Sequence, residues 1–278
     1  MLDDTKKDEL EFLKNFSLAK YRINFECINT ASVLLSNHSM ISGAIYNMIA
    51  QINPIFSYKL HKTTTVKPWS YSLLKFVEKP LKTEKKGFSL IKRGMQGFFF
   101  LKTIDTRVSD CLLKYAEDID SMTIGKLKLK IQQILIEDGR MDNSPDAINT
   151  VTIRLETPTF FYNSSTKKQE SFTGEVFLSS QCDKINQLGI MSLNSEELFP
   201  YLWVLSDNTQ ESWGYLTDRN SKRNAIPFKG RVGYITFKIV GSSFVRDLIW
   251  KLIYLSEFTG IGTRTSVGFG HNSITTIK

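Results

Sequence analysis

The fold is decided by the stretch Gly260-Ile261-Gly262-Thr263-Arg264-Thr265-Ser266-Val267-Gly268-Phe269-Gly270 and by the elements around it. An apolar helical pattern over residues 243–258 precedes this stretch, and a strand-like pattern over residues 271–277 follows it. Glycines let the backbone approach a phosphate chain, and Arg264 adds charge, so we expect a loop that binds a polyanion. A Rossmann dinucleotide site is disfavoured, because its G-x-G-x-x-G follows a strand and opens a helix, whereas here Thr265 replaces the third glycine and the elements are reversed.

The composition is that of a folded protein with room for two domains. The 278 residues are 41% hydrophobic and 23% charged, and the net charge of +8 favours partners that carry many phosphates. The three cysteines, Cys27, Cys111 and Cys182, are far apart and form no C-x-x-C, which argues against a disulfide scaffold or a structural zinc site. No stretch resembles a signal peptide, and no apolar run reaches the ~20 residues of a membrane span, so we expect a cytoplasmic protein without membrane contact.

The first half of the chain shows the order β-α-β-β-α-β. Apolar and polar residues alternate from Arg22, and an amphipathic helix follows until Pro54 ends it. Residues 59–67 are polar and basic, and we predict that they form a loop. The remaining elements are two strands at residues 69–76 and 98–101, a helix that starts at Asp105 and a strand with one basic face, Lys126, Lys128 and Lys130.

The second half repeats this pattern less clearly. The polar residues 137–145 indicate a linker, and strand-like alternation returns at Val151. Residues 196–205 are predicted to be helical, and residues 208–224 are predicted to be a polar loop with Arg219, Lys222 and Arg223. We therefore predict an α+β protein of two tandem ferredoxin-like (RRM-like, βαββαβ) domains, with an N-terminal extension over residues 1–20, a first domain over residues 21–140 and a second domain over residues 147–278.

Such sheets commonly bind RNA through paired aromatics in a K/R-G-F/Y-G/A-F-V-x-F/Y stretch. Residues Gly97-Phe98-Phe99-Phe100 share only part of this pattern. We interpret them as a strand with two of the three phenylalanines in the core.

Histidine, tyrosine and lysine can together cut RNA without a metal. The 2′-OH must be activated against the adjacent phosphorus, the leaving oxygen protonated, and charge on the phosphate balanced. Of the three histidines, His61 lies in a basic segment without carboxylates, and Lys67 follows it in the same segment. Tyr46 lies on the preceding helix, about 120° from the centre of the apolar stripe. Each also has an ordinary explanation, as a solvated histidine, a residue at the rim of the apolar face and a surface charge.

These features resemble the CRISPR-associated repeat-processing endoribonucleases, the Cas6 family of the RAMP superfamily. The resemblance rests on residues 37–47, Leu60-His61, residues 67–72 and the glycine-rich loop. It extends from about Arg22 to the end of the chain. In family members with a tyrosine–histidine–lysine set, tyrosine precedes histidine by fifteen positions and lysine follows by six, and Tyr46, His61 and Lys67 keep both intervals.

The resemblance implies an enzyme that needs neither a metal nor another cofactor and that cuts CRISPR precursor RNA within the repeat. Attack by the 2′-OH would leave a 2′,3′-cyclic phosphate and a 5′-OH. Tyr46 and His61 would act as acid and base, in an order that the sequence leaves open, and Lys67 would stabilise charge in the transition state. His38 and His271 are the second and third candidates for the catalytic histidine.

RNA contacts are expected from the glycine-rich loop, which can also be a tight turn that packs one domain on the other. The loop residues concerned are Gly260, Gly262, Arg264, Thr265, Ser266, Gly268 and Gly270. Candidate basic patches are Arg219, Lys222, Arg223, Lys229 and Arg231, and the lysines of residues 126–130.

Besides repeat RNA, the candidate partners are CRISPR-associated effector subunits and a second copy of the chain. The main alternative function is a non-catalytic RAMP-type scaffold that grips the RNA within an effector complex, and a third is a general basic RNA-binding protein.

Overall fold

The computed structural model describes residues 17–63, 66–85, 87–138, 148–163, 168–217 and 225–277. Most of the expected N-terminal extension and the linker, and all of Arg219, Lys222 and Arg223, lie outside these residues. None of the described helices is long and apolar enough to cross a membrane.

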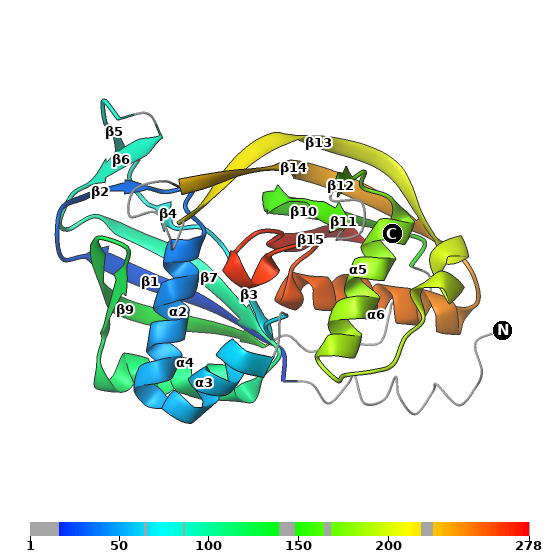
Figure 1. The fold of residues 1–278 in the computed structure, drawn as a ribbon, viewed down its shortest axis with the longest axis horizontal. Helices are drawn as coiled ribbons and strands as arrows, with labels where there is room; N and C mark the ends of the chain where they lie inside the picture. The colour runs from blue at the N-terminus through cyan, green and yellow to red at the C-terminus, as the bar shows by residue number, and fades with distance from the viewer. Residues whose placement is uncertain are drawn as a thin grey trace.

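The first domain is a ferredoxin-like unit (Figure 1). Its central strands are β1 (Ala19–Cys27), β3 (Trp69–Tyr71), β7 (Gln96–Thr103) and β9 (Leu127–Asp138), in the antiparallel order β3-β7-β1-β9. Strand β8 (Ser121–Ile124) extends this sheet beyond β9, and β4 (Lys75–Phe76) pairs with β7. Helices α2 (Ser39–Ile52) and α4 (Thr106–Asp118) bury their apolar residues against one face of the sheet. The small strands β2 (Ala31–Leu34), β6 (Phe88–Ile91) and β5 (Leu81–Lys82) form a separate sheet.

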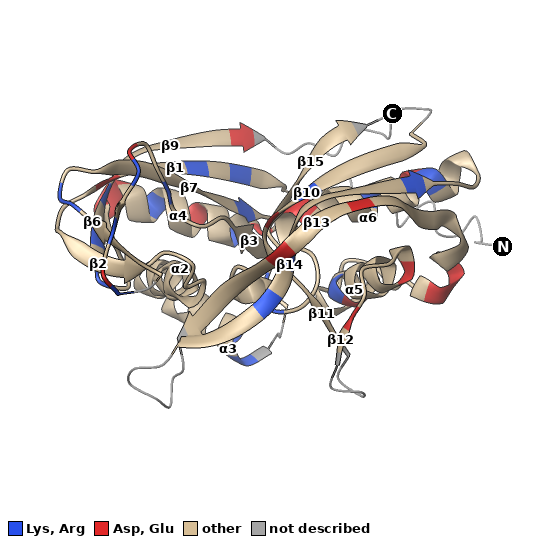
Figure 2. Cartoon of the chain, turned by 90° about the horizontal axis from the view of Figure 1, so that it is seen from above, with Lys and Arg blue, Asp and Glu red and all other residues tan. Residues whose placement is uncertain are grey.

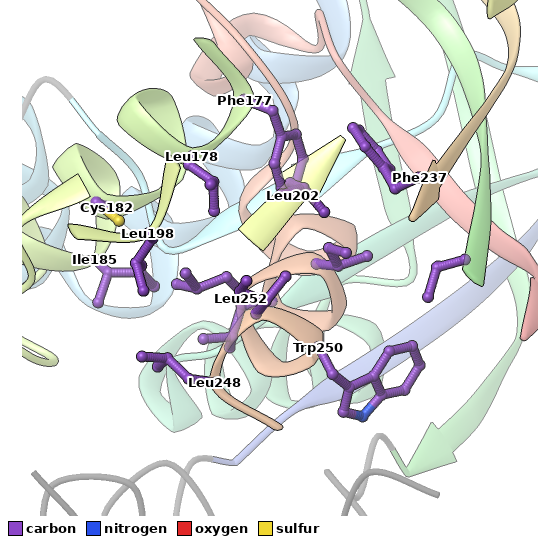
Figure 3. Packing of buried hydrophobic residues seen from close by; sticks show 14 of the residues in the cluster. Phe177, Leu178, Cys182, Ile185, Leu198, Leu202, Phe237, Leu248, Trp250 and Leu252 are labelled. Atoms are coloured by element: carbon purple, nitrogen blue, oxygen red, sulfur yellow. The ribbon is translucent and has the colours of Figure 1, made fainter. Parts of the chain in front are cut away.

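The second domain has the same strand order. Its strands β10 (Thr150–Thr159), β13 (Leu202–Thr217), β14 (Ala225–Ile239) and β15 (Asn272–Ile277) are arranged as β13-β14-β10-β15. In both domains the strands therefore follow the order second, third, first, fourth, which confirms the tandem ferredoxin-like prediction. Helices α5 (Gly174–Gln187) and α6 (Ser243–Thr259) supply one side of the core, shown in Figure 3. The short hairpin of β11 (Phe161–Asn163) and β12 (Lys168–Glu170) lies beside α5.

The prediction of a loop at residues 59–67 is wrong for residues 59–63, which are helical. Pro54 ends α2 but also begins α3 (Pro54–Thr63), because proline lacks only an amide proton that the first helical turn leaves unbonded. The Asn53 side chain accepts a hydrogen bond of 3.0 Å from the amide of Phe56 and so caps the new helix. His61 is therefore held in the last turn of a helix.

The prediction for residues 196–217 also needs correction, while residues 218–224 lie outside the described part of the chain. Two short 3-10 helices, η2 (Ser195–Glu197) and η3 (Phe199–Tyr201), replace the predicted helix, and β13 begins directly after them. The polar residues from Asn208 to Thr217 are strand, paired with β14. Their side chains do not alternate in polarity because this part of the hairpin extends past the second core and reaches the first domain, where Tyr215 forms a bridge with Asn37.

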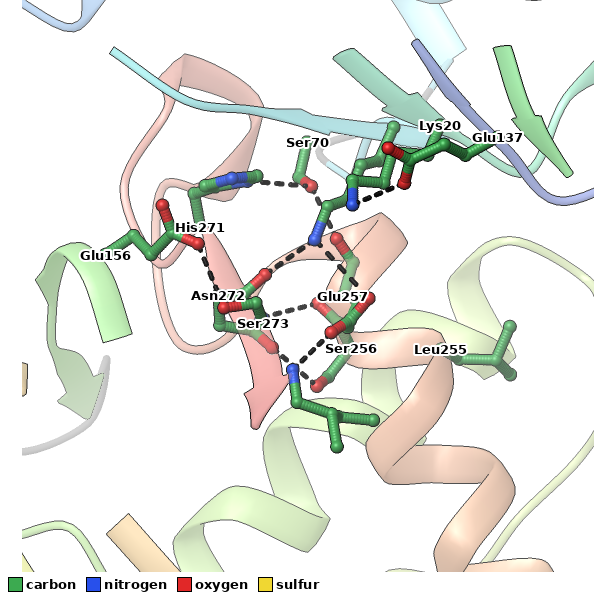
Figure 4. Close-up of polar contacts among 12 residues, drawn as sticks. Lys20, Ser70, Glu137, Glu156, Leu255, Ser256, Glu257, His271, Asn272 and Ser273 are labelled. Atoms are coloured by element: carbon green, nitrogen blue, oxygen red, sulfur yellow. Dashed lines mark hydrogen bonds and ion pairs between the residues drawn. The ribbon is translucent and has the colours of Figure 1, made fainter. Parts of the chain in front are cut away.

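A buried polar network joins the two domains (Figure 4). The Lys102 ammonium donates to the carbonyl oxygen of Asn272 at 2.7 Å and lies 3.4 Å from the Glu257 carboxylate. The Ser70 hydroxyl donates to the carbonyl oxygen of Glu257 at 2.8 Å. Because these partners come from β7 and β3 of one domain and from α6 and β15 of the other, the network fixes the position of the domains relative to each other.

Candidate active site

The side chains of Tyr46 and His61 stack on each other. Their ring centroids are 4.2 Å apart and their planes differ by 22°. Tyr46 lies on α2 and His61 near the end of α3, so the Asn53–Pro54 turn between the helices brings together residues fifteen positions apart. The Tyr46 and Trp69 rings also pack edge to face, with centroids 5.4 Å apart, which holds the half-buried phenol from a second side. His61 is exposed to solvent.

Lys67 lies close to the Tyr46 ring. Its side chain is only 6% exposed, its ammonium donates to the carbonyl oxygen of Leu60, and its nitrogen lies 5.9 Å from the centre of the Tyr46 ring. Burial lowers the pKa of the Lys67 ammonium, because water no longer stabilises its charge. The Tyr46 ring therefore lies close to both of the residues that the spacing singled out with it, the exposed His61 and the buried Lys67.

The glycine-rich loop lies against the same helix. The Ser42 hydroxyl donates to the carbonyl oxygen of Ser266 at 3.0 Å, and Ser42 and Tyr46 are four residues apart on one face of α2. Val66, next to Lys67, lines a cavity of about 310 Å³ together with loop residues 262–266 and the α5 side chains Ser179, Ser180, Asp183 and Lys184. The glycine-rich loop thus contacts α2 one turn before Tyr46 and also lines the cavity.

Packing explains why the loop needs its glycines. Gly268 has a φ of +88°, and a Cβ there would come within 2.5 Å of the Tyr71 ring. At Gly270 an added Cβ would be 1.8 Å from the carbonyl oxygen of Ile261. Of the predicted RNA contacts in the loop, five are buried and shape it, whereas Arg264 is exposed and Ser266 partly so; the buried five are Gly260, Gly262, Thr265, Gly268 and Gly270.

Arg264 adopts the left-handed conformation, with φ of 60°. Its guanidinium carbon lies 4.6 Å from the centre of the Phe228 ring on β14. This contact positions the charge beside the cavity that Arg264 helps to line.

A buried lysine that the sequence analysis missed supports the start of the loop. The Lys184 ammonium and the Gln181 amide both donate to the carbonyl oxygen of Gly260, at 2.6 Å and 3.1 Å. Burial lowers the pKa of Lys184 to about 7. The helix that carries Lys184 is preceded by a threonine, a residue type that commonly caps helices. The Thr173 side chain accepts a hydrogen bond of 3.2 Å from the amide of Val176.

His38 lies inside the interface between the domains and is 0% exposed. Its ring stacks on Phe269 with centroids 4.4 Å apart, and Nδ1 lies 2.9 Å from the carbonyl oxygen of Gly268. Because that oxygen can only accept, Nδ1 is the protonated nitrogen of the neutral ring. Burial lowers the pKa of His38 to about 4, although the hydrogen bond to Gly268 opposes this shift.

His271 is also buried, with Nδ1 3.5 Å from the Ser70 hydroxyl. Its pKa is held well below the usual value, first by burial and then by the positive charge of Lys102. Of the three histidines, His61 alone is exposed.

The members of the predicted basic patches that the structure describes are partly neutralised. Arg231 contacts Asp207 at 3.1 Å, and Lys229 contacts Glu211 at 2.5 Å, both across the β13–β14 pair. The exposed lysines 126, 128 and 130 lie at the edge of the first domain, and Lys130 is 3.7 Å from Asp120. Among the described residues, no three His, Cys, Asp or Glu side chains are grouped as metal ligands.

Two family models match the chain. The model described as CRISPR-associated protein Cas6, N-terminal, matches residues 33–135, and the one described as CRISPR-associated endoribonuclease Cas6 matches residues 153–272. The chain belongs to the Cas6 family. As a Cas6 protein it is a member of a group of CRISPR-associated RNA endonucleases. No curated protein matches the sequence.

Solved Cas6 structures share the fold over nearly the whole length. A product complex of Thermus thermophilus Cas6 (TTHB231) is 18% identical, with a TM-score of 0.65 over 93% of this chain and 100% of that one. A Cas6 (TTHA0078) product complex is 14% identical, with a TM-score of 0.64 over 93% and 99%. A Cas6-related protein from Pyrococcus furiosus is 11% identical, with a TM-score of 0.66 over 93% and 98%.

Proposed function

We propose that this Cas6 protein cuts CRISPR precursor RNA within the repeat, without a metal, through Tyr46, His61 and Lys67. The observation that carries the proposal is the stacked Tyr46–His61 pair, 4.2 Å between ring centroids, with the Lys67 ammonium close to the tyrosine ring. Family membership and solved relatives described as product and substrate-mimic complexes support an RNA substrate.

The proposed reaction is an internal displacement at phosphorus. One of the pair Tyr46 and His61 removes the proton from the 2′-OH, whose oxygen attacks the adjacent phosphorus while the bond to the 5′-oxygen breaks. The other residue protonates that leaving oxygen. The products are a 2′,3′-cyclic phosphate and a 5′-OH, and no water is consumed. A positioned acid or base contributes typically ~10²- to 10⁴-fold to such a rate.

Lys67 would stabilise the additional negative charge on the phosphate in the transition state. Its burial and its hydrogen bond to Leu60 hold the ammonium in place before the RNA binds. Arg264, which is exposed, and Ser266, which is partly exposed, would bind the RNA backbone.

The test is cleavage of a labelled repeat RNA in excess EDTA, alongside the same RNA with a 2′-deoxy nucleotide at the cut. We expect the all-ribose RNA to be cut in EDTA, the deoxy RNA to survive, and the upstream product to carry a cyclic phosphate. Cleavage that requires an added divalent cation would overturn the mechanism. Tight binding of both RNAs without cleavage of either would instead favour the scaffold function.

A further inference from the structure

The first sheet carries a pair of phenylalanines on the face that its helices leave open. Side chains alternate along β7, so Phe99 is buried with the core residues of α2 and α4, while Phe98 and Phe100 point to the opposite face. The expectation that two of the three phenylalanines lie in the core is therefore wrong. Both outer rings are half-exposed.

Three cations surround these rings. The Arg22 guanidinium carbon lies 4.1 Å from the centre of the Phe98 ring, and the Lys20 and Lys75 ammonium nitrogens lie 5.1 Å and 5.4 Å from that of Phe100. The two rings meet edge to face, with centroids 5.6 Å apart. We call these five residues the aromatic sheet face.

The strand register builds this surface. Arg22 on β1 is paired with Phe100, and Lys75 on β4 is paired with Phe98. Gly97 allows β4 to approach, because a Cβ at Gly97 would lie 2.5 Å from the carbonyl oxygen of Lys75. In Figure 2, β1 carries blue basic positions, and helices α2 and α3 lie on the other side of the strands.

The same residue types bind single-stranded RNA on other sheets of this topology. There the two aromatics of G-F/Y-G/A-F lie on the third strand of the βαββαβ unit and stack on successive bases. Here Gly97, Phe98 and Phe100 occupy these positions on β7, the third strand of the unit. Phe99 replaces the small residue of the pattern, and because it points into the core it leaves the outer face unchanged.

The charge of the face suits stacking assisted by a few phosphate contacts. Lys20 is paired with Glu137 at 2.6 Å and Lys75 with Glu156 at 3.0 Å, so part of the positive charge is balanced. The Arg22 Nε donates to the neutral amide oxygen of Asn24 at 3.1 Å. Because Asn24 is neutral, this hydrogen bond does not balance the positive charge that Arg22 places beside Phe98.

We propose that the aromatic sheet face binds a single-stranded segment of RNA, with bases stacked on Phe98 and Phe100 and the backbone near Arg22. The segment would belong to the same repeat RNA but lie outside the cleavage site, since Tyr46 is on α2, which packs on the opposite face of the sheet. The proposal rests on the proposed function only in taking RNA as the substrate.

The test compares two double variants in binding a fluorescent oligouridine of about 12 nucleotides by anisotropy. Phe98→Leu/Phe100→Leu keeps both positions apolar but removes both rings, and we expect its affinity to fall about tenfold or more. Phe98→Tyr/Phe100→Tyr keeps the stacking surfaces and should bind within about threefold of the parent. Arg22→Gln should weaken binding, whereas Lys114→Ala, on the exposed side of α4, should not.

A crosslinking arm locates the RNA directly. The oligonucleotide with 4-thiouridine at each position should crosslink to peptides that contain Phe98 and Phe100. Unchanged affinity of the leucine variant, or crosslinks confined to strands other than β7, would overturn the proposal. Either result would instead favour a protein as the partner of the aromatic sheet face.

Cleavage of repeat RNA at saturating concentration separates this site from the proposed active site. The leucine variant, whose melting temperature should match that of the parent, should need a higher RNA concentration to reach its maximal rate, because it holds the RNA less tightly. Loss of cleavage at saturation with normal oligouridine binding would also contradict a site that serves only to hold RNA.

Discussion

At the scale of single residues, Lys67 differs from its proposed catalytic partners in its surroundings. It is buried and its pKa is lowered, while His61 is exposed and Tyr46 is half-buried. A buried cation is costly unless it has a partner, and here its hydrogen bond to the Leu60 carbonyl is one. A lysine in this position is better explained by a charge that the site needs than by packing alone.

Replacing Lys67 with methionine tests that explanation. The change keeps the apolar stem but removes the charge, and loss of one electrostatic donor costs on the order of 3 kcal/mol in the transition state, or roughly 10²-fold in rate. Single-turnover cleavage should therefore slow by about that factor, with repeat-RNA affinity almost unchanged. Lys62→Met, on the exposed surface of α3, is the matched control and should cut at the parental rate.

His38 makes the stability of the fold depend on pH. Its pKa is about 4 in the folded protein, whereas an ordinary histidine, as in the unfolded chain, has a pKa of 6.5. Between these pH values the unfolded chain therefore binds a proton that the folded chain does not. Stability should therefore fall as the pH falls from about 6.5 toward 4, and is unaffected by this group above 6.5. Between about pH 7.5 and 5 the loss is on the order of 2 kcal/mol.

Urea unfolding at the two pH values measures this effect. The parent should lose more stability on acidification than a His38→Gln variant, since the contribution of His271 is common to both. Equal losses in the two proteins would show that His38 does not titrate in this way.

At the scale of elements, the clear predictions from sequence were those with strong periodicity and a cap. The predicted start of α4 at Asp105 is confirmed, with the Asp105 side chain accepting from the Arg107 amide at 2.9 Å. In contrast, the sequence pattern does not predict α3, because Pro54 reads as the end of α2 although it also begins the next helix. The sequence pattern also does not predict much of β13. Its polar residues form a strand because they pair with β14 and contact the other domain, and local sequence does not encode these contacts.

The candidate site was predictable to a similar degree. The spacing of Tyr46, His61 and Lys67 marked them through the family resemblance, and the structure brings them together. Lys184 could not be found in this way, because its role depends on α5 meeting the carbonyl of Gly260 in three dimensions. Burial of His38 likewise depends on the β13–β14 hairpin and the glycine-rich loop meeting over it.

The glycine-rich loop and α2 offer two glycine substitutions with opposite expected effects. Gly268→Ala would force a Cβ against Tyr71 at a φ of +88°, so we expect a loss of about 1–3 kcal/mol in the free energy of unfolding. Gly43→Ala, in open space within α2, should instead stabilise by about 0.4–1 kcal/mol. Denaturant unfolding of both variants checks the pair. A neutral Gly268→Ala would mean that the loop does not need this backbone conformation.

At the scale of the whole molecule, the two domains form one framework with two chemically distinct faces. The Lys102–Glu257 network and the β13–β14 hairpin tie the domains together. The helix side carries the Tyr46–His61–Lys67 cluster and the glycine-rich loop, and the open side of the first sheet carries Phe98 and Phe100. RNA bound to both would pass around the first domain.

The most direct test of the central claim is single-turnover cleavage of repeat RNA by the His61→Ala protein, with binding measured on the same samples. The rate should fall about 10²- to 10⁴-fold while the dissociation constant stays close to that of the parent. Cleavage by His61→Ala at the parental rate would contradict the proposed role of the Tyr46–His61–Lys67 cluster.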